Sequence, residues 1–219
     1  MVVRERFEQE LKEIQGQFVE IASSSINALK IAFDALLAQD LEKSLKVLED
    51  DLVINRLEEE INDRVILMIA KQQPVATDLR RLMVLVKAAS DMERVGDYAV
   101  NIAKETIRLG KEPLVFPTTN LQTMCNKTIE MLESIIKAFT EEDTVSAKEI
   151  AELDDYVDDL YGATVTLLLR AGADNPSHIH QITHLTFVCR YLERSADHAT
   201  NIAEHLFYLV KGKHYELNN

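Results

Sequence analysis

The stretch ERVGDYAVNIA at residues 93–103 returns 100 positions later as ERSADHATNIA at residues 193–203, and seven of the 11 positions are identical. Upstream, DLVINRL at residues 51–57 is similar to DDYVDDL at residues 154–160, at an offset of 103. A repeat of about 100 residues is too long for a solenoid built from short units. The sequence therefore predicts two copies of one domain that pack as a single molecule with pseudo-twofold symmetry.

Glycine and proline are scarce in this chain of 219 residues, with 6 and 4 respectively. Their sum is under half of the share of roughly 12% that average usage gives. The chain is 47% apolar and 28% charged, a composition that fits neither a disordered segment nor a β-sandwich with many turns. Its apolar residues recur at steps of three and four, which is typical of amphipathic helices.

Three helices are predicted before the segment that contains Pro113 and Pro117. The first has an apolar stripe that runs from Phe7 to Leu36, and Asp40 is the expected N-cap of the second. The third covers about 78–109. The apolar stripe of the second helix begins with Leu41, Leu45, Leu48 and Leu52.

Three more helices are predicted in the second half, over about 119–139, 144–171 and 177–211. The fold class is thus all-α, with two tandem pseudo-symmetric three-helix bundles. The expected organisation is a first repeat at 1–110, a linker at 111–118 and a second repeat at 119–219.

The formal charge is −13, from 24 Lys and Arg against 37 Asp and Glu. So acidic a chain has few of the clustered cations with which nucleic-acid-binding proteins and polybasic membrane anchors meet phosphates. Its longest apolar run, Val65 to Ala70, is far shorter than the ~18 residues of a spanning helix, and the N-terminus turns charged at once. We therefore expect a cytoplasmic protein with no nucleic-acid partner and no direct membrane insertion.

Each repeat carries acidic and amide side chains four residues apart on its third helix, which places them near one helix face. A second such stripe lies on the preceding helix. Carboxylates converging from two helices offer the oxygen ligands that hard cations prefer. The candidates are Glu93, Asp97 and Asn101 with Asp51, Asn55 and Glu58 in the first half, and Glu193, Asp197 and Asn201 with Asp154 and Asp158 in the second.

A solvated charged stripe is the simpler interpretation of any one copy, but the carboxylates persist in both copies while most neighbouring residues differ. Arg94 and Arg194 adjoin the two motifs and are candidate ion-pair partners for them. Metal coordination and a charged docking surface both remain open from the residues alone. We interpret His178 and His180 as loop residues rather than metal ligands, because the acidic motifs lie several turns away, and Cys125 and Cys189 match no zinc-binding spacing.

The motifs DMERVGDYAVNIA at 91–103 and YLERSADHATNIAE at 191–204 resemble the hallmark of the PhoU family of phosphate-uptake regulators. QPVATDLR at 73–80 is similar to the loop that enters the third helix in that family. The resemblance implies two three-helix bundles and multinuclear iron or zinc clusters held by E(D)xxxD motifs. It also implies a cytoplasmic homodimer that represses phosphate-starvation signalling and restrains high-affinity phosphate uptake.

The implied partners are the ATPase subunit of the phosphate ABC transporter and a membrane sensor histidine kinase. Asn55 replaces the carboxylate that Asp158 supplies in the other half, so the first site is one formal charge poorer. The metal ligands that the resemblance implies are Asp51, Glu93, Asp97, Asp154, Asp158, Glu193 and Asp197.

Two other interpretations remain. A ferritin-like or other di-metal enzyme uses Glu-x-x-His, and no histidine of this chain has an acidic residue three positions before it. Phosphate-binding GxxxxGK[ST] loops and GxSxG elbows are also absent from the sequence, so we do not expect an enzyme. The alternative to a metal-binding regulator is a metal-free helical adaptor whose acidic stripes dock a basic partner.

Overall fold

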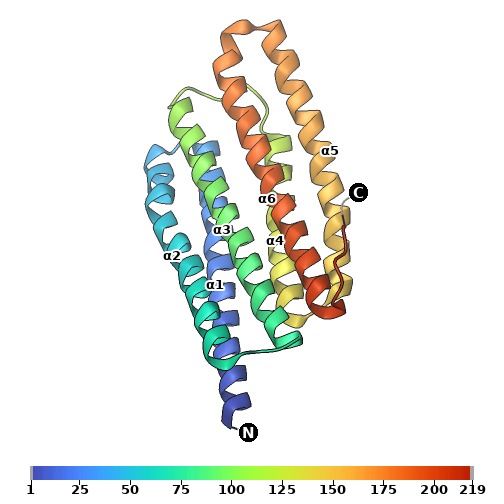
Figure 1. The fold of residues 1–219 in the computed structure, drawn as a ribbon. Coiled ribbons are helices and arrows are strands. Elements are labelled where there is room, and N and C mark those ends of the chain that lie inside the picture. Colours follow the sequence, from blue (N-terminus) through green and yellow to red (C-terminus); the bar gives the residue numbers. More distant parts are fainter. Residues whose placement is uncertain (1, 218–219) are drawn as a thin grey trace.

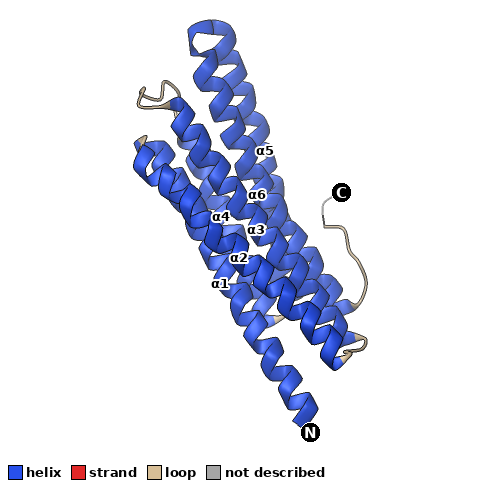
Figure 2. Ribbon diagram, turned by 60° about the vertical axis from the view of Figure 1, so that its left-hand side comes forward, coloured by secondary structure: helices blue, strands red, loops and turns tan. Residues whose placement is uncertain are grey.

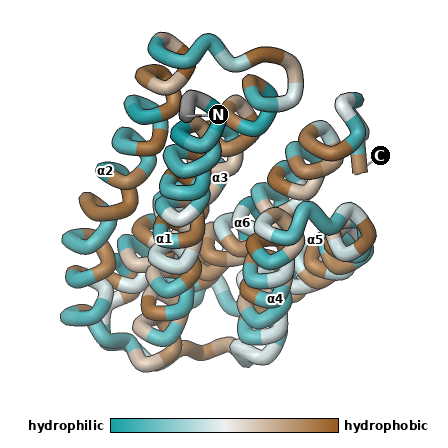
Figure 3. The backbone as a smooth tube through the Cα atoms, turned by 90° about the horizontal axis from the view of Figure 1, so that it is seen from below, coloured by the Kyte–Doolittle hydropathy of each residue, from teal (hydrophilic) through white to brown (hydrophobic). Residues whose placement is uncertain are grey.

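The computed structural model describes residues 2–217, and within them it contains six long helices and one short 3₁₀ turn (Figures 1 and 2). α1–α3 form one bundle and α4–α6 form the other; α3 packs against α6 where the bundles meet (Figure 3). The elements are α1 Val2–Ala38, α2 Leu41–Gln72, α3 Thr77–Leu109, α4 Thr119–Glu141, α5 Thr144–Asp174, η1 Pro176–His178 and α6 Ile179–Lys211.

The predicted helices and the fold class are confirmed, and equivalent aspartates begin equivalent helices. Asp40 Oδ1 accepts hydrogen bonds from the backbone N–H groups of Glu42 and Lys43, at 3.1 and 3.0 Å. Asp143, 103 positions later, caps α5 in the same way. One prediction at a helix start is wrong: His180 lies in the first turn of α6 and not in a loop, because the 3₁₀ turn runs directly into that helix.

The prediction of which leucines form the buried face of the second helix is also wrong. Leu45 and Leu52 are 52% and 60% exposed, and Leu41 and Leu48 are half-buried. The side chains that α2 turns towards α1 and α3 lie mostly seven residues apart, which is two helical turns. Because α2 has leucines on its exposed face as well, the sequence pattern did not distinguish the buried face. The buried residues of α2 are Ser44, Val47, Ile54, Ile61, Val65 and Met68.

α1 packs against α2, α3 and α4, and part of it is apolar enough to resemble a membrane-spanning helix. Within Arg4–Ala38, an 18-residue window has a mean hydropathy of 1.3, and half of it is buried among the other helices. Length and composition alone would let this helix cross a membrane. A core helix of a bundle meets the same criterion, since it is apolar on most of its faces.

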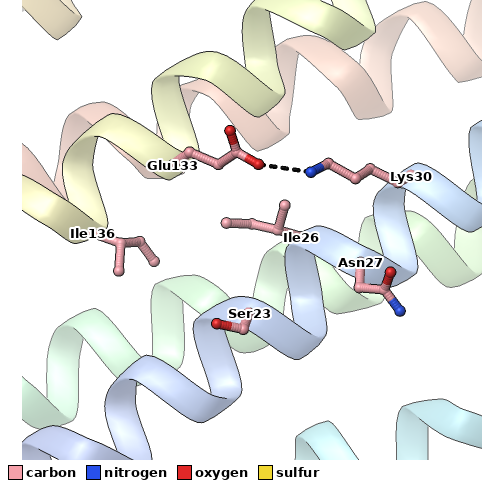
Figure 4. A pocket seen from close by; sticks show the side chains of 6 residues that line it. All are labelled: Ser23, Ile26, Asn27, Lys30, Glu133 and Ile136. Atoms are coloured by element: carbon pink, nitrogen blue, oxygen red, sulfur yellow. Dashed lines mark hydrogen bonds and ion pairs between the residues drawn. The ribbon is translucent and has the colours of Figure 1, made fainter.

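α1 also contacts the second bundle through α4. The rings of Phe18 and Phe139 pack with centroids 4.7 Å apart. Lys30 Nζ forms an ion pair of 2.6 Å with Glu133 Oε1 at the edge of an open pocket of about 300 Å³ (Figure 4). One hydrophobic core therefore continues from α1 across to α4.

Tyr98 on α3 and His198 on α6 mark the position of the pseudo-twofold axis. Their numbers differ by the repeat offset of 100, and their ring centroids lie 5.8 Å apart. Equivalent residues of two copies meet only where the axis passes between them. The neighbouring contacts show the same symmetry. Asp91 of α3 contacts His198 of α6, and their equivalents in the other repeat, Tyr191 and Tyr98, stack with ring centroids 5.9 Å apart.

Within each bundle, close packing between the second and third helices depends on a matched pair of residues. A Cβ added at Gly96 on α3 would lie 3.1 Å from Ile54 Cδ1 on α2. In the second repeat the equivalent positions hold Ala196 and Val157. The second repeat thus has one more side-chain carbon on its third helix and one fewer on its second. At this pair of positions, the two repeats have the same number of side-chain carbons.

This compensation predicts that substitutions at positions 96 and 54 have non-additive effects on the free energy of unfolding. Alanine is favoured over glycine within a helix by about 1 kcal/mol, but overpacking against Ile54 costs about 1–3 kcal/mol. Gly96→Ala is therefore expected to be more favourable in an Ile54→Val background than in the native chain, by about 1 kcal/mol. Urea unfolding of the two single variants and the double variant measures this difference, and additive effects would contradict it.

Candidate metal-binding sites

The second repeat brings three carboxylates together between α5 and α6. One oxygen of each of Asp158, Glu193 and Asp197 lies within 4.8 Å of the other two. Asp158 is exposed at the surface of α5, while Glu193 and Asp197 are partly buried on α6. Asp154, one turn before Asp158, is buried and lies outside this group of three. We call Asp158, Glu193 and Asp197 the α5–α6 triad.

The first repeat places Asp51 and Glu58 of α2 beside Glu93 and Asp97 of α3, all partly buried. We call these four residues the α2–α3 cluster. Among the described residues, it contains no three carboxylate oxygens as close as those of the triad. Asn55 occupies the position equivalent to Asp158, and its amide donates to Asp51 Oδ2 at 3.1 Å. An amide thus replaces one of the charges that the second repeat gathers.

Burial and mutual repulsion raise the pKa of several of these carboxyl groups. Burial is the larger cause for Asp51 and Glu93, and the charge of Asp97 adds to it. In the triad, burial and then the charge of Asp197 raise the pKa of both Asp158 and Glu193. Each cluster therefore concentrates negative charge that the folded chain compensates incompletely.

The arginines next to each motif compensate part of that charge. Arg94 Nη1 lies 2.9 Å from Asp97 Oδ2, and Arg194 Nη1 lies 3.1 Å from Asp197 Oδ2. Both pairs are spaced i, i+3 along exposed helix faces, where ion pairs contribute little stability. The two arginines thus hold the outer aspartates in equivalent orientations in the two repeats.

The donor set fits a hard cation. Each cluster offers carboxylate oxygens from two helices, which is the ligand type that hard divalent and trivalent ions take. Three oxygens of the clusters are shielded from solvent and lack hydrogen-bond partners: Asp51 Oδ1, Asn55 Oδ1 and Glu193 Oε2. Of these, Glu193 Oε2 also faces two arginines, Arg190 at 3.7 Å and Arg194 at 3.9 Å. Buried polar atoms in folded proteins almost always have a partner, so the oxygens of Asp51 and Asn55 point to a position where an ion or water is expected.

The two asparagines of the motifs have different surroundings. Asn201 turns its amide towards α3, where it lies 3.4 Å from Asp91 Oδ1. A step of eight residues rotates about 80° around a helix, so the third motif position points away from the first. Asn101 is partly buried at the equivalent position of α3.

Sequence reasoning missed a group of charged residues between α3 and α6. Asp91 accepts a hydrogen bond of 2.7 Å from His198 Nδ1 and forms an ion pair of 3.2 Å with His205 Nε2. These contacts lower the pKa of Asp91 against the opposing effect of burial. These contacts could be found only once the packing of α3 against α6 was known. The one signal in the sequence was the alignment of the repeats, in which a titratable residue, His198, takes the place of Tyr98.

The model of the PhoU domain matches this chain twice, at residues 18–106 and 121–206. The chain belongs to the PhoU family. The two matches cover both three-helix bundles, including both E(D)xxxD motifs.

Curated relatives in this family are similar over their whole length. The Clostridium acetobutylicum protein named phosphate-specific transport system accessory protein PhoU homolog is 35% identical over 219 residues, which is 100% of both chains. The Aquifex aeolicus protein with the same description is 40% identical and covers 93% of this chain and 92% of its own.

Two crystal structures share the fold. PhoU from Pseudomonas aeruginosa superposes with a TM-score of 0.91 at 29% identity, over 94% of this chain and 100% of that one. The phosphate transport system regulatory protein PhoU from Streptococcus pneumoniae gives a TM-score of 0.90 at 28% identity, over 96% and 99%.

Repulsion in the α2–α3 cluster predicts a pH-dependent stability effect in metal-free protein. Because the pKa of Glu93 is raised, its ionisation destabilises the fold at neutral pH, and protonation at lower pH removes that cost. Glu93→Gln is therefore expected to raise the free energy of unfolding at neutral pH, with the gain shrinking as the pH falls through the carboxyl range to about pH 4.

Urea unfolding followed by circular dichroism in EDTA, at several pH values, measures this gain. Glu20→Gln, at an exposed position of α1, is the control and is expected to have no such pH dependence. A gain that is constant across the carboxyl range would show that repulsion at Glu93 is not its cause.

Proposed function

We propose that this protein is a non-catalytic, cytoplasmic accessory regulator of a phosphate transport system. In this role it restrains high-affinity phosphate uptake and represses phosphate-starvation signalling. Full-length similarity to proteins named as accessory or regulatory components of phosphate transport carries the proposal. The absence of a Glu-x-x-His motif from the sequence favours regulation over di-metal catalysis.

The partners that fit this role are the ATPase subunit of the phosphate transporter and a membrane sensor histidine kinase. Regulation through them requires that the protein bind two conformations of a partner with different affinities. Its long helices present continuous surfaces on both bundles, and a homodimer is the assembly that we propose. Leu45, Leu52, Val53, Ile66 and Leu67 of α2 are more than half exposed and add apolar area to such a surface.

The two acidic clusters are the proposed metal centres, with iron or zinc as the ions. In the second repeat, Asp158, Glu193 and Asp197 would hold the ion from two helices. In the first repeat, Asp51, Glu93 and Asp97 would do so, with Asn55 in support. Bound cations would supply positive charge that neutralises the repelling carboxylates. The support is the close spacing of the triad oxygens and the buried oxygens that have no hydrogen-bond partner.

Metal content per chain tests the proposed centres. Protein purified without chelators or an affinity tag is expected to contain two or more iron, zinc or manganese ions per chain by mass spectrometry. Glu93→Gln with Asp97→Asn, and Glu193→Gln with Asp197→Asn, are each expected to remove about half of the metal that the acidic clusters bind, because each pair serves one repeat.

The control for those variants is Glu59→Gln with Asp63→Asn, an exposed acidic pair with the same spacing on α2. It is expected to retain the full metal content. A folded wild-type protein without metal would instead favour the adaptor hypothesis, in which the acidic faces dock a basic partner and binding depends on salt but survives EDTA.

Deletion of the gene tests the regulatory role. The expected result is expression of phosphate-starvation genes even in phosphate-rich medium, because the restraint on the sensor kinase is lost. Complementation with the native gene is expected to restore repression. Normal repression in the deletion strain, or dioxygen consumption with turnover by the metal-loaded protein, would overturn the proposed function.

A further inference from the structure

The first turns of α6 carry two histidines that face one another. His180 and His184 are four residues apart and therefore share a helix face. Their Nε2 atoms share a hydrogen bond of 3.2 Å, and their rings meet edge to face with centroids separated by 4.5 Å. Nine residues separate His184 from Glu193, which is about 14 Å along the helix, so this pair is distinct from the α5–α6 triad.

A buried carboxylate of the other repeat orients one of these rings. Glu105 on α3 has a side chain that is only 2% exposed, and its Oε2 lies 2.5 Å from His184 Nδ1. A carboxylate can only accept, so the proton between them belongs to Nδ1 and the lone pair of His184 lies on Nε2, where it accepts the proton of His180 Nε2. Arg108 pairs with the other oxygen of Glu105 and balances its charge.

We propose that His180 and His184 bind a divalent transition-metal ion through their Nε2 atoms, with Glu105 as the residue that positions His184. Two nitrogens held at about 2.0–2.1 Å by a tetrahedral zinc ion lie about 3.3 Å apart. An ion can therefore replace the proton of the 3.2 Å hydrogen bond between the rings while both rings keep their positions. A metal-bound histidine usually donates its other N–H to a carboxylate, as His184 does to Glu105.

Solvent reaches the pair from one side. His180 is exposed and lines an open pocket of about 380 Å³ together with Glu112 and His178. Water from this pocket can complete the coordination sphere. Imidazole nitrogens favour zinc, copper and nickel, whereas the carboxylate clusters offer oxygen alone, so the two kinds of site differ in the ions that they prefer.

The first repeat does not contain this pair. Its equivalent residues are Arg80 and Val84. Arg80 instead reaches the end of α6, where its Nη1 lies 3.4 Å from the backbone oxygens of Tyr208 and Leu209. A cation at the C-terminal end of a helix is favourable there. The histidine pair is therefore specific to the second repeat, and the proposal concerns one ion per chain.

Copper(II) distinguishes this site from the acidic clusters, because only imidazole ligands give nitrogen hyperfine splitting in the electron paramagnetic resonance spectrum. Untagged, chelator-treated full-length protein receives less than one equivalent of copper. The wild type is expected to show splitting from two nitrogens. His180→Ala and His184→Gln are each expected to lose it, while His214→Ala, at an exposed position near the C-terminus, is expected to retain it.

Zinc titration by calorimetry tests the positioning role of Glu105. Glu105→Gln keeps the shape of the side chain but removes its charge, and it is expected to weaken the histidine-dependent zinc binding about 10–100-fold. Circular dichroism verifies that each variant is folded; His180 is exposed, so His180→Ala keeps the test valid if the buried substitutions unfold the protein.

Absence of nitrogen splitting in the wild type, or its persistence in His180→Ala, would overturn the site. Unchanged zinc affinity in Glu105→Gln would overturn the role of Glu105.

Discussion

The packing of α3 against α6 is the contact on which the rest of the molecule depends. Each of these helices is the third of its bundle and carries the acidic motif on the side facing the second helix. The opposite side meets its equivalent at the pseudo-twofold axis, between Tyr98 and His198. Because one helix serves both contacts, the orientation that pairs the bundles also sets the direction in which each set of carboxylates points.

The interface between the bundles is more polar than the helix pattern suggests. Glu105 is buried, and Asp91 lies between two histidines. Buried charges are tolerated only when they are paired, and each of these carboxylates has two cationic or imidazole partners. The equivalent positions of the second repeat hold His205 and Tyr191, so the two repeats contribute different chemistry to this interface.

The sequence predicted the helices well because their limits depend on local chemistry. Asp40 caps α2 as expected, and the linker prolines lie between the two sets of helices. The orientation of α2 was not predictable from its own residues, since Leu45 and Leu52 are as apolar as the buried positions. Contacts such as His184 with Glu105 join residues 79 positions apart and became visible only through the pairing of α3 with α6. The alignment of the repeats located the acidic clusters, but only the fold showed that the carboxylates of the second repeat lie closest together.

The compensating pairs at the second and third helices have a consequence for how the two halves evolve. Genetic exchange between duplicated segments tends to make them identical. Here, copying the third helix of the second repeat into the first would place an alanine against Ile54, and the reverse exchange would leave a gap between glycine and Val157. Each helix fits its own neighbour better than it fits its duplicate's neighbour. Selection for stability would then act against such recombinants, so the packing between the helices itself keeps the two halves different.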